Sequence, residues 1–287
     1  MNIKDVTIII PAFNEEAAVF EVVDGLEKSF PGVEVIVVDD GSTDETAFSA
    51  KKAGAFVLSH KRNRGYGASL KTGVRMSNRP YVLFCDADGQ HSIEDVKNVI
   101  NAGDNFDMVV GARDRGSHVA WKRVLGKSLL SCFANFLLGE RIPDFNSGLR
   151  LVKREVLLKY FHLLPDGFSM STTMTFAFFK SGYDIKWVSI NAKKRKGKSS
   201  VSQIRHGFQT IMLMLRLTVL FEPLKVFLFI SGIFFVAGIA SLAFNLIMTI
   251  GQSMGKLTIL LFVSALIMFM FGLLCDQVSA LRRELHN

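Results

Sequence analysis

The stretch DADGQH, residues 86–91, places two carboxylates one residue apart at the end of an apolar run. Carboxylates in this spacing suit a hard divalent cation such as Mg²⁺ or Mn²⁺, which prefers oxygen ligands and can share them with a diphosphate. Gly89 permits the chain to turn after the strand, and such a turn is predicted to bring Asp86 and Asp88 to one ion. A solvated turn followed by a helix capped at Ser92 is the alternative interpretation.

The segments before and around this motif alternate short apolar runs with helical patterns. The runs at 6–10, 33–38 and 81–85 predict buried strands, and the alternation predicts an α/β fold with a mostly parallel sheet covered on both faces. Asn14 and a capping box beginning at Ser42 are predicted to start the helices after the first two strands. Since ligands bind at the carboxyl ends of such strands, PAFNEE, DDGSTDE and DADGQH are predicted to share one rim.

The C-terminal part of the chain has a different character. Residues 224–250 carry only Lys225 as a charge, and residues 257–275 carry none, so each run is long enough to cross a bilayer. We therefore predict two transmembrane helices over 224–275, with two buried helices of a globular core as the alternative. Basic flanking residues place the N-terminal part and the tail 276–287 in the cytoplasm, and the opening MNIKDVTIII does not resemble a signal peptide.

Two further helical patterns precede the apolar runs. Residues 118–139 and 201–223 are predicted to lie in the membrane interface, although core helices would show the same pattern. The three cysteines have no metal-ligand spacing, which favours reduced core thiols. A net charge of +8 and a mean hydropathy of +0.29 favour lipid headgroups and phosphates over nucleic acid as partners.

Five motifs occur in a fixed order: IIIPAFNEE, VVDDGSTDET, NRGYGASLKTG, DADGQH and FNSGLRLVKR. Together they resemble the family 2 glycosyltransferases of GT-A fold, and with the C-terminal spans they resemble the polyprenyl-phosphate (dolichyl- or undecaprenyl-phosphate) glycosyltransferases. The resemblance implies a Rossmann-like GT-A domain with a mixed, mostly parallel sheet over residues 1–200. It is followed by an interfacial helix at 201–223 and by the two spans.

The resemblance also implies roles for single residues. Asp86, Asp88 and Gln90 match the Asp-x-Asp-x-Gln pattern that holds Mg²⁺ or Mn²⁺. Arg64 and Lys71 are predicted to face the base or the phosphates, with a solvated helix position as the alternative for Lys71. The remaining residues predicted to bind the nucleotide are Pro11, Phe13, Glu15, Asp39, Asp40, Gly41 and Ala87.

The acceptor side is predicted from cations. Arg113, Arg123 and Lys127 are candidates for the phosphate of the lipid, which an arginine can hold through two hydrogen bonds. Arg195 and Ser199 match the Arg-x-Gly-x-Ser loop that, in the family, closes over the donor diphosphate or the acceptor phosphate. The run of basic residues around them also suits an anionic leaflet, and a solvated basic loop would explain part of it.

A general base is not evident in the sequence. The segment from Phe168 to Lys180 has no acid, and the Gln-x-x-Arg-Trp motif of processive synthases is absent. A phosphate acceptor is largely dianionic at neutral pH and needs no base, whereas a hydroxyl acceptor does. Asp144 is the fallback base, although a role in orienting the donor sugar is favoured. The predicted catalytic set is therefore Asp86, Asp88, Arg113 and Asp144.

These motifs predict inverting, metal-dependent transfer of one sugar from a UDP- or GDP-linked donor to polyprenyl phosphate. The reaction would take place at the cytoplasmic face of the inner membrane. Two alternatives remain: a membrane-anchored transferase that uses a glycan hydroxyl, and a non-catalytic membrane scaffold. The sugar, the base and the prenyl length stay open, and homo-oligomerisation is implied by the resemblance alone.

Overall fold

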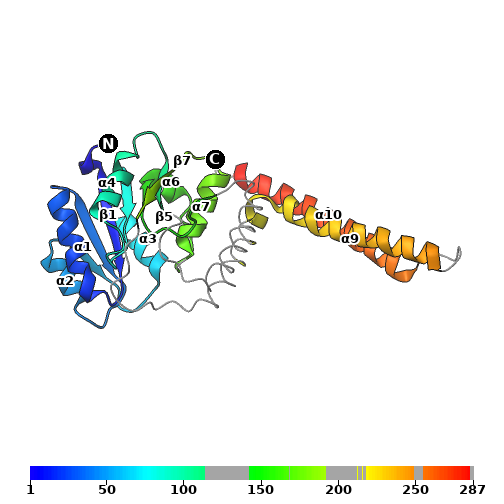
Figure 1. Cartoon of the computed structure of the whole chain (residues 1–287), viewed down its shortest axis with the longest axis horizontal. Coiled ribbons are helices and arrows are strands. Elements are labelled where there is room, and N and C mark those ends of the chain that lie inside the picture. Colours follow the sequence, from blue (N-terminus) through cyan, green and yellow to red (C-terminus); the bar gives the residue numbers. More distant parts are fainter. Residues whose placement is uncertain are drawn as a thin grey trace. The chain divides into compact units, whose positions relative to one another are not determined.

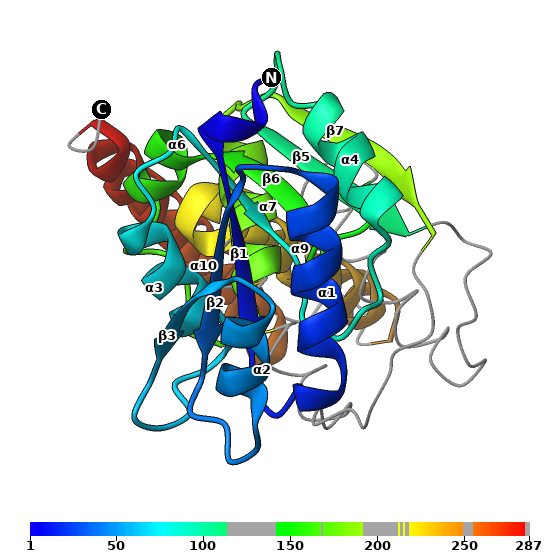
Figure 2. The same ribbon diagram turned by 90° about the vertical axis from the view of Figure 1, so that its left-hand side faces the viewer.

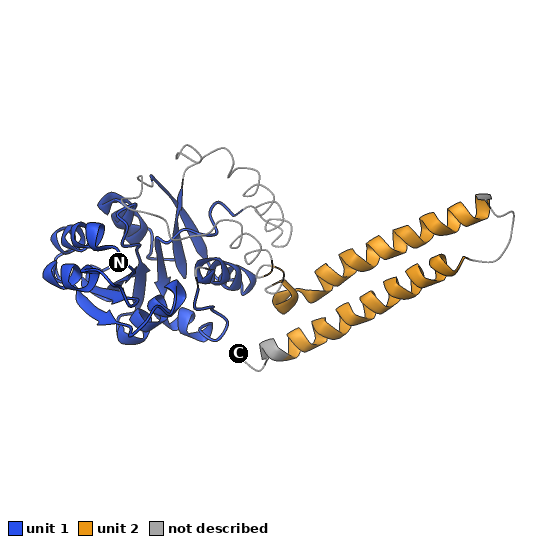
Figure 3. Ribbon diagram, turned by 90° about the horizontal axis from the view of Figure 1, so that it is seen from below, with its two compact units in different colours: residues 1–210 blue, residues 211–287 orange. Residues whose placement is uncertain are grey.

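The computed structural model describes residues 1–113, 142–167, 169–191, 218–248 and 255–284, together with residues 212 and 215. The chain forms two compact units, residues 1–210 and 211–287 (Figure 3). The predicted helix at 118–139 and most of the one at 201–223 lie outside the described residues. The predicted boundary at residue 200 also lies outside them.

The first unit alternates strands and helices along the chain (Figure 1). Its elements are η1 (Ile3–Asp5), β1 (Val6–Ala12), α1 (Glu16–Ser29), β2 (Glu34–Asp39), α2 (Thr46–Lys52), β3 (Phe56–Ser59), α3 (Tyr66–Met76), β4 (Tyr81–Phe84), α4 (Ile93–Asn101), β5 (Met108–Arg113), β6 (Arg150–Lys153), α6 (Arg154–Lys159), α7 (Met170–Lys180) and β7 (Ile185–Ile190).

The strands form one seven-stranded sheet in the order β3-β2-β1-β4-β6-β5-β7. β1 pairs in parallel with β2 and β4, β2 with β3, and β5 with β7, whereas β6 is antiparallel to both of its neighbours. The mixed, mostly parallel sheet is therefore confirmed. Because β6 runs the opposite way, its first residue, Arg150, pairs with Phe84 at the end of β4. The segment that precedes β6 thus enters at the edge where the parallel strands end.

Helices cover both faces of this sheet, because alternate residues of the strands point to opposite sides. Ile8 and Ile10 of β1 pack with residues of α1, α2 and α4, while Ile9 packs with residues of α3, α6 and α7. Figure 2 shows α1 and α4 on one side of β1 and α3 on the other. All three isoleucines are completely buried. An apolar layer on each face of the sheet therefore holds the strands in place.

The loops that follow β1 and β2 are joined by two side chains, Asn14 and Ser42, that were predicted to cap helices. Asn14 does not cap α1; it has a φ of 54°, and its Oδ1 accepts a hydrogen bond from the Thr43 amide at 2.9 Å. Ser42 does not begin a capping box either, since its Oγ accepts from the Asn14 amide at 2.9 Å. Both predictions were wrong because contacts between the two loops replace the local caps. The capping box at Ser92 is confirmed.

The second unit contains α9 (Pro223–Met248) and α10 (Lys256–Glu284). Both helices are long and apolar enough to cross a membrane, with candidate spans at Pro223–Ile247 and Lys256–Leu281. Side chains such as Phe244 and Ile247 are 62% and 75% exposed, as lipid-facing residues would be. α10 continues past residue 275, so the first part of the predicted tail is helical.

Candidate active site

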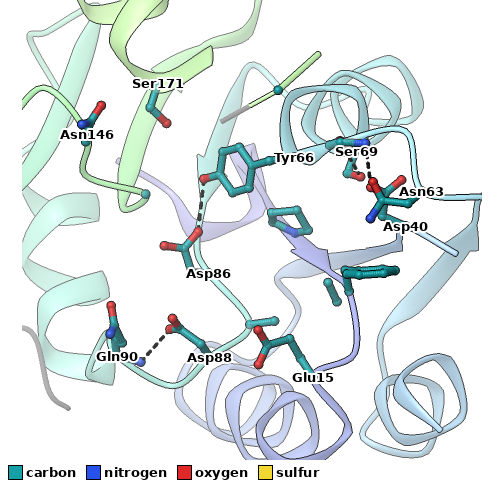
Figure 4. A pocket seen from close by; sticks show the side chains of 17 residues that line it. Glu15, Asp40, Asn63, Tyr66, Ser69, Asp86, Asp88, Gln90, Asn146 and Ser171 are labelled. Atoms are coloured by element: carbon teal, nitrogen blue, oxygen red, sulfur yellow. Dashed lines mark hydrogen bonds between the residues drawn. The ribbon is translucent and has the colours of Figure 1, made fainter. Parts of the chain in front are cut away.

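A cavity of about 560 Å³ lies at the edge of the sheet where β1, β2 and β4 end. Three of the motif segments, PAFNEE, DDGSTDE and DADGQH, contribute to its lining, so their predicted convergence is confirmed. The predicted site residues that line this cavity are Pro11, Phe13, Glu15, Asp40, Asp86, Ala87, Asp88 and Gln90. In Figure 4 the carboxylates of Asp86 and Asp88 lie near the centre of the site.

Asp86 follows β4 and is held by groups from three other segments. The Tyr66 hydroxyl donates to Asp86 Oδ1 at 3.1 Å, and His91 Nε2 lies 3.6 Å from Oδ2, too far for a hydrogen bond. Burial alone would raise the pKa of Asp86, but His91, Tyr66 and Arg113 together bring it below its ordinary value. The carboxylate is therefore ionised at neutral pH.

Gly148 explains how the segment before β6 can approach this carboxylate. A Cβ at position 148 would stand 2.1 Å from Asp86 Oδ2, which no side chain can do without displacing one of the two. The backbone at Gly148 therefore forms a wall directly against Asp86.

Asp88 is brought to the same cavity by the predicted turn. β4 ends at Phe84, Gly89 has a φ of 71°, and the Gln90 amide donates to Asp88 Oδ1 at 3.1 Å. Asp88 is only 8% exposed. Asp86 and Asp88 therefore face one space.

These groups fit a divalent cation of the Mg²⁺ or Mn²⁺ type. No cluster of three His, Cys, Asp or Glu side chains that could hold a metal occurs in the described part of the chain. Two carboxylates with an amide oxygen such as that of Gln90 leave positions for water and for diphosphate oxygens. Mg²⁺ is usually held in this way, by one or two carboxylates together with substrate phosphates.

The acidic pair Asp39 and Asp40, at the end of β2, accepts hydrogen bonds from the loops, although Asp40 also lines the cavity. Asp40 Oδ1 accepts from the Arg64 amide at 2.9 Å and lies 2.6 Å from His60 Nδ1, and its Oδ2 accepts from the Gly65 amide at 2.8 Å. Asp39 Oδ1 accepts from the Ser42 amide at 3.1 Å. Most of the acceptor capacity of Asp40 is thus used inside the protein. Asp39 and Asp40 were both predicted to contact the nucleotide.

Gly41 and Lys71 are not among the residues that line the cavity. Gly41 has a φ of 73°, and a Cβ there would stand 2.7 Å from the Arg62 carbonyl carbon. Lys71 Nζ donates to Leu164 O at 2.5 Å and to Asp166 Oδ1 at 2.7 Å. Both residues therefore link segments of the chain, and nothing in their geometry supports the predicted contact with a nucleotide.

Arg113, the last residue of β5, is paired with Asp144. Its Nε and Nη2 donate to the two oxygens of Asp144 at 2.7 and 3.2 Å. Burial alone would raise the pKa of Asp144, but Arg113 brings it below its ordinary value. A strongly acidic, ion-paired carboxylate is a poor proton acceptor, so Asp144 is better suited to orienting Arg113 than to acting as a base.

Arg150 was missed by the sequence analysis, although it lies in the quoted motif FNSGLRLVKR. It is fully buried, and burial lowers its pKa to about 10, so it is a cation at neutral pH. Its guanidinium donates twice to Ser147 O, at 3.1 and 2.6 Å, and to Ser171 O and Thr175 Oγ1 at 2.8 and 3.1 Å. No sequence signal separates such a cation from a surface arginine, because its partners lie up to 25 positions away.

Arg150 joins the two segments that form one side of the cavity. Asn146, Gly148 and Ser171 line the cavity, and the Asn146 and Ser171 side chains lie beyond Tyr66 and Asp86 in Figure 4. Thr172 Oγ1 also donates to Asn146 Oδ1, which leaves the amide NH₂ of Asn146 as a donor. This side therefore offers neutral polar groups such as those that bind sugar hydroxyls.

The remaining predicted acceptor residues cannot be placed. Arg123, Lys127, Arg195 and Ser199 lie outside the described residues.

Two family models match the chain. The model described as glycosyl transferase family 2 matches residues 7–161, more than half of the chain. The model described as GtrB C-terminal hairpin matches residues 222–281, which contain α9 and most of α10. The first match includes most of the residues that line the cavity, although Gly167 and Ser171 lie beyond it.

Individual relatives agree with these matches. A dolichyl-phosphate hexose transferase of Haloferax volcanii is 27% identical, over 71% of this chain and 89% of its own length. A polyprenol monophosphomannose synthase of Mycolicibacterium smegmatis is 29% identical, over 70% of this chain and 83% of its own.

Solved structures show the same fold. Glucosyl-3-phosphoglycerate synthase of Mycobacterium tuberculosis, in complex with Mn²⁺, uridine diphosphate and phosphoglyceric acid, gives a TM-score of 0.64 at 22% identity. The match covers 74% of this chain and 78% of that one. The predicted GT-A fold is therefore confirmed.

Proposed function

Because the chain belongs to glycosyl transferase family 2, we propose that it transfers one sugar from a nucleotide diphosphate sugar to polyprenyl phosphate, with inversion at the anomeric carbon. The observation that carries this proposal is the placement of Asp86 and Asp88 on one cavity, opposite a wall of neutral polar groups. The relatives named as dolichyl-phosphate and polyprenol-phosphate sugar transferases support the acceptor.

The donor diphosphate would lie beside Asp86 and Asp88. A divalent cation bound there, with Gln90 as a further ligand, would neutralise the charge of the departing diphosphate. The neighbour that binds Mn²⁺ and uridine diphosphate supports a metal of this kind. Phe13, 37% exposed at the cavity, offers a ring against which the base can stack.

The acceptor would approach from the side of Arg113. The Arg113 side chain is 34% exposed and its guanidinium is held by Asp144, so it is oriented and would be accessible to a phosphate. A dianionic phosphate attacks the anomeric carbon without a general base, which agrees with the pairing of Asp144. Arg113 would orient the attacking oxygen, and Asn146 and Ser171 would hold the sugar hydroxyls.

The helical hairpin would anchor the enzyme in the membrane that holds its lipid acceptor. The two candidate spans and the match to a GtrB C-terminal hairpin support membrane anchoring. We propose the cytoplasmic orientation from the basic residues that flank the spans, Lys225 and the pair at 282–283, because positive charges favour that side.

The test is a product assay on the purified full-length protein in detergent. The protein is incubated with Mn²⁺, a short-chain polyprenyl phosphate and a panel of UDP- and GDP-sugars, and glycolipid is detected by mass spectrometry. The Asp88→Ala variant should lose the product. The matched variant Asp24→Ala, which changes a partly exposed carboxylate of α1, should keep it.

A hydroxyl acceptor is the outcome that would overturn this proposal. If no donor yields lipid product, and one donor is consumed only when a glycan is supplied, the acceptor assignment is wrong. A protein that binds neither Mn²⁺ nor any nucleotide sugar would support the scaffold alternative. NMR of the anomeric proton in the product tests inversion separately.

A further inference from the structure

Tyr66 lies between two glycines that another segment approaches very closely. A Cβ on Gly65 would stand 2.5 Å from Asp166 O, and a Cβ on Gly67 would stand 2.2 Å from Pro165 O. Residues with side chains could not occupy either position without moving backbone atoms. The glycines on both sides of Tyr66 are therefore explained by the packing of residues 164–167 on the start of α3.

Hydrogen bonds also join the start of α3 to residues 164–167. The Ala68 amide donates to Asp166 O at 3.0 Å, and Lys71 Nζ donates to Leu164 O and to Asp166 Oδ1. We call this contact of the first two turns of α3 with residues 164–167 the α3 clamp. It fixes the backbone that carries Tyr66.

The fixed tyrosine in turn reaches Asp86. Its hydroxyl donates to Asp86 Oδ1 at 3.1 Å across the cavity (Figure 4), and burial and the charge of Asp86 keep the pKa of Tyr66 well above its ordinary value. The backbone of Gly148 lies against the other oxygen of the same carboxylate. With one oxygen bonded and the other in contact, the carboxylate cannot rotate freely about its Cβ–Cγ bond.

We propose that Tyr66, held by the α3 clamp, is a positioning residue that sets the orientation in which Asp86 meets the divalent cation. This inference rests on the metal in the proposed function. Tyr66 acts through Asp86, as the partners that orient metal ligands do in other proteins, where their loss costs about 10–100-fold in metal affinity.

The test is Mn²⁺ binding, measured from the electron paramagnetic resonance signal of free Mn²⁺. Each protein solution contains uridine diphosphate or guanosine diphosphate and is compared with a protein-free solution of the same nucleotide. We expect Tyr66→Phe to weaken Mn²⁺ binding by about 10-fold. Tyr81→Phe removes a hydroxyl from the opposite end of β4 and should bind as the wild type does. In an Asp86→Ala background, Tyr66→Phe should add less than about twofold, because the acceptor of the Tyr66 hydroxyl is then absent.

Lys71→Met provides a second variant if Tyr66→Phe does not fold. It loosens the α3 clamp without changing a residue of the cavity, and it should weaken Mn²⁺ binding about threefold, a smaller effect in the same direction.

Two results would overturn the inference. If the wild type binds Mn²⁺ and a folded Tyr66→Phe variant binds it within about twofold, Tyr66 does not position Asp86, while the proposed function stands. If the wild type itself takes up no Mn²⁺ with either uridine diphosphate or guanosine diphosphate present, the metal in the proposed function and the role of Tyr66 both fail.

Discussion

Each side of the cavity is held by charged side chains, and the sign of the charge differs between the two sides. On the side of β1, β2 and β4, carboxylates accept hydrogen bonds from backbone amides, as Asp40 does from two amides and Asp88 from one. On the side of β6 and α7, the guanidinium of Arg150 donates to backbone carbonyls. We call these the amide-held side and the carbonyl-held side.

The two sides differ in how far each depends on a single charged side chain. The amide-held side distributes its bonds over several carboxylates, so the loss of one leaves the others in place. On the carbonyl-held side most of the bonds come from one fully buried cation, Arg150, and Thr172 adds one bond to Asn146. Arg150 has no ion-pair partner within 4 Å among the described residues. Removing a buried charge that satisfies several polar groups is costly, because those groups are left without partners.

The largest effect is expected from Arg150→Met. It leaves Ser147 O without its two hydrogen bonds from the guanidinium, while Ser171 O keeps the bond from Thr175 Oγ1. The loss should cost about 3 kcal/mol, or roughly a 10 °C fall in the melting temperature of the full-length protein. Arg79→Met, at an exposed arginine, is the matched control and should melt as the wild type does. Equal melting temperatures for the two variants would show that the carbonyl-held side does not depend on Arg150.

Gly148→Ala should come next, since it forces the two sides apart where they meet. Its Cβ would stand 2.1 Å from Asp86 Oδ2, so Asp86 must move. A shift of about 1 Å in a catalytic group costs on the order of 100-fold in rate, and we expect a loss of that size in glycolipid formation. Gly25→Ala in α1 is the control and should keep full activity. A Gly148→Ala enzyme of normal rate would contradict the assigned contact.

Asp40→Asn tests the amide-held side. The carboxamide keeps the shape but loses the charge, and its NH₂ group faces a backbone amide, so we expect a loss of about 2 kcal/mol, or about 6 °C in melting temperature. Asp24→Asn, in an exposed pair with Lys28, should change it by less than about 1 °C. A loss as large as that of Arg150→Met would remove the difference between the two sides.

The smallest effect concerns Asp166 and Lys71, which join the two sides. The hydrogen bond from Lys71 lowers the pKa of Asp166, so the pair stabilises the fold above the ordinary pKa of an aspartate, near 4, and this contribution disappears as the pH falls through the lower folded value. Because Asp166 is 63% exposed, the contribution is at most about 1 kcal/mol.

The measurement compares wild type and Asp166→Asn by thermal melting from pH 6 to pH 3. The wild type should melt slightly higher at pH 6, and the two should converge at the acidic end. A difference that grows as the pH falls would contradict the sign of the pKa shift.

Much of the fold and part of the site could be predicted from the sequence. The apolar runs gave β1, β2 and β4, whose parallel pairing places Asp86 and Asp88 at one edge. The turn at Gly89 and the cap at Ser92 were also predictable, because both are set by neighbours within a few residues. Local chemistry and strand alternation were enough for this part.

What could not be predicted depends on contacts between distant segments. The Asn14 amide donates to the Ser42 hydroxyl, 28 positions away in the chain. That both residue types can cap a helix does not predict this partner. Lys71 bonds across 93 and 95 positions, which no periodicity reveals. Arg150 resembles any charged residue at the start of a strand, and only the sheet order shows that its side chain is enclosed.

The antiparallel strand β6 also determines the order in which the sheet can be completed during synthesis. β5 has only β6 and β7 as neighbours in the sheet, and both follow it in the chain. β1 to β4 can therefore pair as they leave the ribosome, whereas β5 must wait until residues 114–153 have been made. At about 5–20 residues per second this wait lasts several seconds, during which both edges of β5 are open to a chaperone or to another nascent chain.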